Sequence, residues 1–179
     1  AIIALVGGNT WTATRKIDAS DNEVAVTFNI SIVDAYGNSG TAGTVTTNGS
    51  SVLVDKTAPT ISAVTVPSGS YGIGSVIIVT VNADASGYSG ETVKVNNENC
   101  SLIYSSGTTY KIYYNVLYSS TNLDKVPMLP INLQLKDLAG NISTEVTQAT
   151  VQGGTLTINT KPTYHITGTT SRCASSATA

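Results

Sequence analysis

Apolar and polar residues alternate along the chain, most regularly between residues 60 and 151. Clusters of Gly, Ser, Asn and Pro divide this stretch into seven short apolar segments, which read TISAVTV, SVIIVTVN, ETVKVN, CSLIY, TTYKIYYNV, LPINLQLK and TEVTQATV. A period of two is typical of strands with one buried face, whereas an amphipathic helix has a period of 3.6. Seven alternating strands in about 100 residues indicate an all-β, immunoglobulin-like Greek-key β-sandwich.

The same pattern occurs twice along the chain. Asp34 begins DAYGN and Asp137 begins DLAGN, 103 residues later. The segments before these motifs, VAVTFNISIV and PMLPINLQLK, have apolar residues at matching positions. Further upstream GNTWTATRKI pairs with GTTYKIYYNV, which places Trp11 opposite Tyr110. Self-similarity of this kind predicts an array of tandem repeats of about 103 residues each.

The repeat divides the chain into three parts. Residues 1–54 correspond to the C-terminal half of an immunoglobulin-like repeat, and residues 55–159 to a complete repeat. Residues 160–179 correspond to the first strand of a further repeat, or to a strand donated to a neighbour. The half-repeat lacks the strands that would cover its apolar face, and an open sheet edge can accept a strand from another chain. Adjacent domains of a longer string, or copies assembled head to tail, would then complete it.

Charge and hydropathy exclude two classes of partner. Charged residues make up 11% of the chain, well below the roughly 25% of an average domain. The net charge is −2 and no basic cluster exceeds the pair Arg15–Lys16, so we expect no nucleic-acid binding. The most apolar run, SVIIVTV, is far shorter than the roughly 20 residues of a spanning helix, so we expect no membrane insertion.

Each D-x-x-G-N motif is followed by a short proline-containing segment. DKTAPT begins at Asp55 and NTKPT begins at Asn159. An Asp at the start of a turn accepts hydrogen bonds from amides two residues on, and the Gly supplies a positive φ. Proline fixes φ and stiffens the step that follows. One interpretation is therefore structural: tight hairpin turns followed by stiff joints between domains.

The expected topology adds a second interpretation of the same residues, a metal site. In such a sandwich the start of the first strand, the second-to-third loop and the sixth-to-seventh loop lie at one pole. In the complete repeat they carry three carboxylates and a carboxamide: Asp55, Asp84, Asp137 and Asn141. Calcium takes six to eight oxygen ligands in irregular geometry, so we expect calcium here. The next joint has Asn159 in place of the aspartate and should bind more weakly.

The chain offers little for catalysis. Its single histidine, His165, lies in an alternating segment, and no G-x-S-x-G motif accompanies it. Two cysteines, Cys100 and Cys173, allow one disulfide or two free thiols, and two cysteines alone do not make a zinc site. We therefore do not expect an enzyme.

Several tyrosines suggest a binding surface. In TTYKIYYNV the neighbours Tyr113 and Tyr114 point to opposite faces of the strand, so at least one should be exposed. Exposed aromatic rings can stack on sugars or contact a protein, and the candidates for such a patch are Tyr104, Tyr113 and Tyr118. Ordinary cross-strand packing is the alternative.

Together, GNTWTATRKI, the D-x-x-G-N loop and DKTAPTI resemble the bacterial immunoglobulin-like (Big-type) repeats of large secreted and cell-surface proteins. Tyr110 in place of tryptophan, and the segment TNLDKVPMLP, depart from that pattern. The resemblance implies an extracellular, non-catalytic stalk, adhesin or filament subunit. It also implies neighbouring copies or adjacent immunoglobulin-like domains as partners, and joints that calcium can stiffen. A carbohydrate-binding surface module that binds a glycan or receptor, and a phage or appendage fibre subunit, are the alternative functions.

Overall fold

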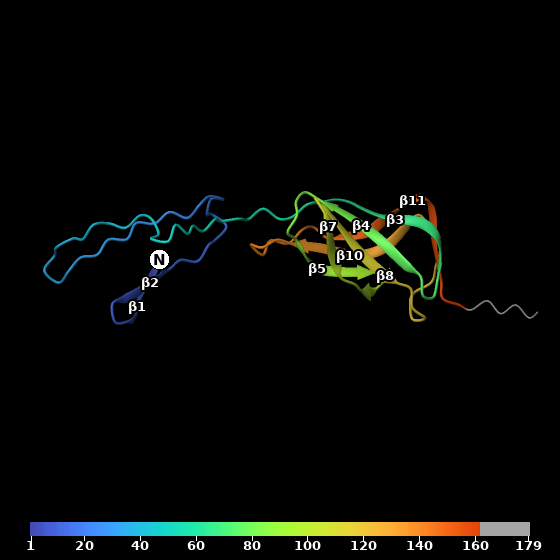
Figure 1. Ribbon diagram of the computed structural model, residues 1–179, viewed down its shortest axis with the longest axis horizontal. Helices are drawn as coiled ribbons and strands as arrows, with labels where there is room; N and C mark the ends of the chain where they lie inside the picture. The colour runs from blue at the N-terminus through green and yellow to red at the C-terminus, as the bar shows by residue number, and fades with distance from the viewer. Residues whose placement is uncertain (162–179) are drawn as a thin grey trace, which may run out of the picture.

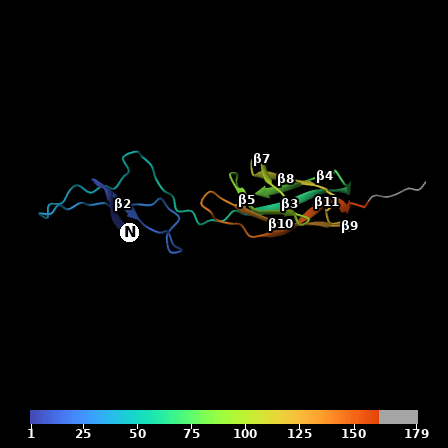
Figure 2. The ribbon, with the colours of Figure 1, turned by 90° about the horizontal axis from the view of Figure 1, so that it is seen from below.

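The computed structural model describes residues 1–161 and, within them, contains strands and no helix. Nine strands between Ile61 and Asn159 form one continuous sheet that curls around a core (Figures 1 and 2). Residues 1–54 lie to one side of this sheet and contribute a two-stranded hairpin. The expected all-β class is confirmed.

The nine-stranded sheet has the order β6-β5-β10-β11-β3-β4-β8-β7, and β9 pairs with β11 outside this path. Its strands are β3 (Ile61–Gly72), β4 (Val76–Ala83), β5 (Ser89–Val95), β6 (Glu98–Asn99), β7 (Leu102–Ser106), β8 (Thr109–Asn115), β9 (Leu123–Val126), β10 (Met128–Lys136) and β11 (Val146–Asn159). Short β6 and β9 were not expected from the alternation, because neither shows enough residues to establish a period of two.

Strand β3 has two different partners. Its first half pairs antiparallel with β4, and its second half, from Thr65 to Gly72, pairs in parallel with β11. The alternation predicted an end near Val66 because Pro67 interrupts the pattern. The parallel pairing extends β3 beyond the proline, and it passes a register shift in β11 where Gly153 has a φ of 75°. Thus β3 connects the strands β4-β8-β7 to the strands β11-β10-β5.

The core lies inside the curl and follows the alternation. Its fully buried side chains come mainly from β4, β8, β10 and β11, and the largest are Tyr110, Tyr114, Ile77, Ile112, Leu129, Leu133, Leu135, Leu156 and Ile158. Burial of each such side chain stabilises the fold by about 1.5–3 kcal/mol before conformational entropy is subtracted. As predicted for neighbours on one strand, Tyr114 is buried and Tyr113 is exposed.

Both buried tyrosines have hydrogen-bond partners for their hydroxyl groups. Tyr110 Oη donates to the carbonyl of Ala85 at 3.2 Å, and Tyr114 Oη accepts from Asn96 Nδ2 at 3.0 Å. The same Asn96 amide donates to the carbonyl of Thr121 at 2.7 Å. Because Asn96 is itself buried, these bonds satisfy polar groups that water cannot reach.

Residues 1–54 are paired far more sparsely. Strands β1 (Ile2–Gly7) and β2 (Thr10–Thr14) form a hairpin, and the remainder has three isolated bridges, Ala25↔Leu53, Ile30↔Gly43 and Val33↔Ser39. Nearly all apolar side chains of this part are exposed. The alternating pattern is present here, but nothing among the described residues covers its apolar face.

The pairings that do form match those of the larger sheet. Leu5 pairs with Trp11 in the first hairpin, and Tyr104 pairs with Tyr110 in the β7–β8 hairpin, each followed by the same one-residue register shift. Each member of the second pair lies 99 residues after its counterpart.

The bridges match as well, with an offset of 103 residues. Ile30↔Gly43 corresponds to Leu133↔Val146, and Val33↔Ser39 to Lys136↔Ile142. Of the third expected part, residues 160–179, only Thr160 and Lys161 are described. The expected strand, His165 and Cys173 lie outside the described residues.

The buried Asn96–Tyr114 hydrogen bond gives a first testable prediction. Tyr114→Phe should lower the free energy of unfolding by about 1–2 kcal/mol, because the Asn96 amide loses a partner in the core. Tyr113→Phe, on the exposed face of the same strand, is the matched control and should change stability little. Denaturant unfolding of both variants would measure this, and equal stability would show that the bond contributes nothing.

Candidate functional site

The segment Asp55–Thr60 joins residues 1–54 to β3, and hydrogen bonds tie it to both sides. We refer to Asp55–Thr60 as the joint. On the N-terminal side, Glu23 Oε1 accepts from the Lys56 amide at 2.6 Å and from Thr57 Oγ1 at 3.0 Å. The Lys56 ammonium group donates to the carbonyls of Ala19, at 3.1 Å, and Asp21.

On the other side of the joint, two loops of the larger sheet make contacts. Asn141 Nδ2 donates to the carbonyl of Asp55 at 3.2 Å. Asp84 Oδ1 accepts from the Thr60 amide at 3.0 Å, and the Asp84 amide donates to the Thr60 carbonyl at 3.0 Å. The joint is therefore fixed at both ends by named side chains. This is the arrangement that stiffens a connection between two parts of a chain.

Both D-x-x-G-N loops have the hydrogen bonds expected of the motif. Asp137 Oδ1 accepts from the Asn141 amide at 2.8 Å, and Asp137 Oδ2 accepts from Asn141 Nδ2 at 2.8 Å. Asp34 makes the same two bonds to Asn38, each at 2.8 Å. The glycines Gly37 and Gly140 have φ of 87° and 98°, values that favour glycine. In the second loop the motif positions Asn141 to reach the joint.

The start of the next proline-containing segment has a similar arrangement. Asn159 Oδ1 accepts from the Lys161 amide at 3.0 Å, as Asp55 Oδ1 accepts from the Thr57 amide at 3.0 Å. Asn122 Oδ1 accepts from the Thr160 amide at 2.7 Å and from Thr160 Oγ1 at 2.8 Å.

Asn122 lies 99 residues after Glu23, the same offset that relates Tyr110 to Trp11. Equivalent positions thus supply the side-chain oxygen that accepts from the backbone amide of Lys56 in the joint and of Thr160 in the later segment. The contacts of Glu23 and Asn122 were not expected from the sequence, because each lies more than 30 residues along the chain from the backbone it contacts. Their equivalent spacing was the one available signal.

Hydrogen bonds favour the charged forms of Asp84 and Asp137. A backbone hydrogen bond from Thr60 is the main cause that lowers the pKa of Asp84. For Asp137, desolvation opposes the shift, but hydrogen bonds from Asn141 and the loop amides outweigh it and lower its pKa. Tyr88 lies near both carboxylates: burial, followed by the neighbouring Asp84, raises its pKa. Asp84 and Asp137 therefore both act on Tyr88.

The four candidate calcium ligands act as hydrogen-bonding groups in the joint and in the loops beside it. Asp55, Asp84 and Asp137 each accept from a backbone amide, and Asn141 directs its amide nitrogen toward the joint. Among residues 1–161, no three His, Cys, Asp or Glu side chains form a group that could hold a metal ion. Calcium binding at this pole stays a prediction, and it would require some carboxylate oxygens to exchange amide partners for the cation.

The three candidate tyrosines do not share one face. Tyr104 pairs with the inward-facing Tyr110, and their rings meet edge to face with centroids 5.8 Å apart. Tyr113 points outward, because it lies an odd number of residues from Tyr110 on β8. Tyr118 lies in the turn after β8 and is exposed. Glycan or receptor binding by these residues stays a prediction, and Tyr118 is the most exposed of the three.

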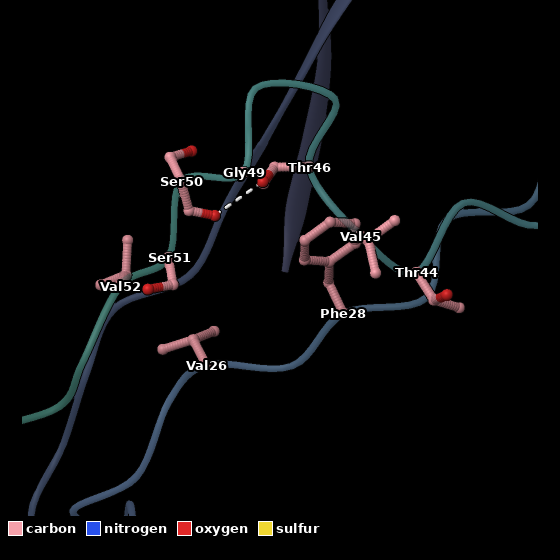
Figure 3. A pocket seen from close by; sticks show the side chains of 9 residues that line it. All are labelled: Val26, Phe28, Thr44, Val45, Thr46, Gly49, Ser50, Ser51 and Val52. Carbon is pink, nitrogen blue, oxygen red and sulfur yellow. Dashed lines mark hydrogen bonds between the residues drawn. The ribbon is translucent and has the colours of Figure 1, made fainter.

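Two further features of the described residues are a free thiol and a hollow. Cys100 is a half-buried free thiol, and desolvation raises its pKa, which makes it a poor nucleophile. A hollow in residues 24–54 is lined by Val26, Phe28, Val45 and Val52, with threonine and serine hydroxyls beside them (Figure 3). This hollow was not expected from the sequence, because its lining joins two segments that are about 20 residues apart.

No protein-family model, curated protein or solved structure matches the chain. Within residues 1–161 there is no helix with the length and apolar character needed to cross a membrane.

The lowered pKa of Asp137 predicts a pH-dependent contribution to stability. A depressed folded-state pKa stabilises the fold above the unfolded-state value of about 3.9, and this contribution is lost as the pH falls through the folded-state pKa. Asp137→Ala should therefore reduce stability at pH 7 and reduce it less near pH 3. Thermal unfolding across this range would test it, with Asp124→Ala controlling for the loss of one exposed β-strand carboxylate. A penalty that is constant with pH would contradict the role of the charged form.

Proposed function

We propose that the chain is a non-catalytic structural or adhesive repeat protein of the cell surface, in which immunoglobulin-like domains follow one another through stiff joints. It would act as part of a stalk, an adhesin or a filament. The observation that carries this proposal is the joint geometry, which occurs at Asp55–Thr57 and again at Asn159–Lys161. A single domain needs no such segment at both ends, whereas a string of domains needs one at every step.

The strand order supports an immunoglobulin-like Greek-key sandwich for the complete unit. Such a domain has strands A, B, E and D in one sheet and C, F and G in the other. Taking β3, β4, β5, β7, β8, β10 and β11 as A to G in chain order, the pairings β3-β4-β8-β7 and β5-β10-β11 follow that arrangement. The division of β3 between β4 and β11 would then join the two sheets at one edge.

Matching pairings support the tandem arrangement. The hairpin register, the bridges and the D-x-x-G-N hydrogen bonds recur with offsets of 99 or 103 residues. The proposal therefore takes residues 1–54 as the C-terminal half of a unit, residues 55–159 as a complete unit and residues 160–179 as the start of another. Glu23 contacts the joint, and Asn122, at the equivalent position, contacts the segment that begins at Asn159. Stiffness would therefore be transmitted from one unit to the next.

The proposal places the protein outside the cell, where the Big-type repeats that it resembles occur. Its partners would be neighbouring copies or adjacent domains of the same type. Calcium belongs to this proposal as a ligand of the joint, with oxygen atoms from Asp55, Asp84 and Asp137. Carboxylates are ligands that calcium prefers, and a site between two parts of the chain would hold them together.

Removal of the Glu23 carboxylate tests the stiffness of the joint. Glu23→Ala deletes the acceptor for the Lys56 amide and Thr57 Oγ1, so the joint should open more often. We expect trypsin to cleave after Lys56 about three to ten times faster than in the unchanged chain, since exposed, charge-assisted hydrogen bonds have a modest net energy.

Mass spectrometry of a digestion time course would measure this rate relative to cleavage elsewhere in the chain. Glu145→Ala removes an exposed carboxylate that accepts from Asn132 Nδ2, far from the joint in sequence, and serves as the matched control. Equal cleavage after Lys56 in all three proteins would contradict a stiff joint.

Small-angle X-ray scattering tests the calcium part of the proposal. Calcium at the joint should narrow the distribution of maximum dimensions of the full chain, and a chelator should reverse the change. The Asp84→Asn and Asp137→Asn double variant should no longer respond. Scattering that is unchanged by both calcium and chelator would remove calcium from the proposal and leave the hydrogen-bonded joint as the stiffening element.

A further inference from the structure

A turn closed by the same backbone hydrogen bond occurs twice, shortly before each side chain that binds a proline-containing segment. In the first turn, Asp18–Asp21, the Asp21 amide donates to the Asp18 carbonyl at 3.2 Å. In the second turn, Leu117–Ser120, the Ser120 amide donates to the Leu117 carbonyl at 3.1 Å. The second turn lies 99 residues after the first. The backbones of the two turns are therefore closed alike, and the turns can be compared side chain by side chain.

The side chain at the end of each turn makes the same bond but differs in charge. In the first turn the Asp21 carboxylate accepts from the Asp18 amide at 2.9 Å, and it also pairs with the Arg15 guanidinium. In the second turn the Ser120 hydroxyl accepts from the Leu117 amide, also at 2.9 Å. A charged oxygen in the first turn is therefore replaced by a neutral oxygen in the second.

The acceptor that follows each turn differs in the same way. The Glu23 carboxylate accepts from the Lys56 amide at 2.6 Å. The Asn122 carboxamide accepts from the Thr160 amide at 2.7 Å. Each acceptor also binds a threonine hydroxyl, that of Thr57 at 3.0 Å and that of Thr160 at 2.8 Å. Both segments thus receive the same two kinds of hydrogen bond, from a charged group in the joint and from an uncharged group in the later segment, Asn159–Lys161.

The joint also brings a cation to its turn. The Lys56 ammonium group donates to the carbonyls of Ala19, at 3.1 Å, and Asp21. Hydrogen bonds from Ser20 are the main cause that lowers the pKa of the Asp18 carboxyl, and the positive charge of Lys56 adds to this effect. The lysine of the joint is therefore attracted to the acidic turn that it contacts. In the later segment an uncharged threonine follows the asparagine, where the lysine follows the aspartate of the joint.

We infer that the joint is held in part by attraction between charges, whereas the later segment is held by matching hydrogen bonds without charge, so that salt loosens the first and leaves the second unchanged. This inference rests on the proposed function and specifies how the connection between two units responds to its surroundings. Attraction between exposed charges is screened beyond about 10 Å at 0.1 M salt and beyond about 3 Å at 1 M. The groups that carry the charge are Arg15, Asp18, Asp21, Glu23 and Lys56.

Amide hydrogen exchange followed by NMR measures both places in one sample of the full chain. The protection of the Lys56 and Thr160 amides is compared at about 0.01 M and about 1 M sodium chloride, where the Debye length is about 30 Å and about 3 Å. We expect the protection of the Lys56 amide to fall about twofold to fivefold, as for the loss of exposed charge pairs, and that of the Thr160 amide to stay constant. The Asn38 amide, which donates to the Asp34 carboxylate at 2.8 Å, controls for salt effects on any amide bound to a carboxylate.

Three variants of the full chain complete the test. Lys56→Met removes the ammonium group and keeps an unbranched side chain, so it should reduce the salt response of the amide at position 56 to that of the Asn38 amide. Glu23→Gln keeps an acceptor oxygen without its charge and should also reduce the response. Lys94→Met removes an exposed lysine of β5 and is the matched control, in which the Lys56 amide should respond as in the unchanged chain. The amide spectrum of β3–β11 shows whether each variant stays folded.

Three outcomes would overturn the inference. They are an equal salt response of the Lys56 and Thr160 amides, a Lys56 response no larger than that of the Asn38 amide, and an unchanged response in Lys56→Met. If both amides are nevertheless protected at high salt, the joints are stiff without help from charge, and the proposed function stands. If neither amide is protected at either salt concentration, the segments are not held at all, and the proposed function fails together with the inference.

Discussion

The parallel pairing of β3 with β11 is the interaction on which the rest of the structure depends. Because β3 also pairs with β4, it joins strands that otherwise have no backbone contact and closes the curled sheet around the core. Without it, the strands β4-β8-β7 and β11-β10-β5 would be two sheets with no backbone pairing between them. Burial of Tyr110, Tyr114 and the leucines of β10 follows from this closure.

The first 54 residues share local features with the larger sheet but not its burial. Their hairpin has the same register as β7–β8, and their loop at Asp34 has the same hydrogen bonds as the loop at Asp137. Local structure therefore forms from local sequence. Burial differs between the two parts: equivalent apolar positions are exposed in residues 1–54 and buried in the sheet of β3–β11, because burial depends on strands that pack across the core.

The joint combines hydrogen bonds between residues close in sequence with hydrogen bonds from residues far along the chain. The aspartate of DKTAPT and the asparagine of NTKPT each accept a bond from the amide two residues on, which is local chemistry. Glu23, Asn122 and Asn141 then reach these segments from distant parts of the chain. A connection tied at both ends transmits orientation, and this property, rather than a cleft or a reactive group, is what supports a structural role for the molecule.

The sequence by itself determined the all-β class, the alternation that separates Tyr113 from Tyr114, and the D-x-x-G-N turns. Each depends on residues that are close in sequence, where side-chain period and turn chemistry act directly. Only the tertiary structure decided the extension of β3 past Pro67, the role of Glu23 in the joint and the separation of Tyr104 from Tyr113 onto opposite faces. These features depend on which strands meet across long sequence separations. A pattern of apolar and polar residues specifies that a face must be covered, but it does not specify by what.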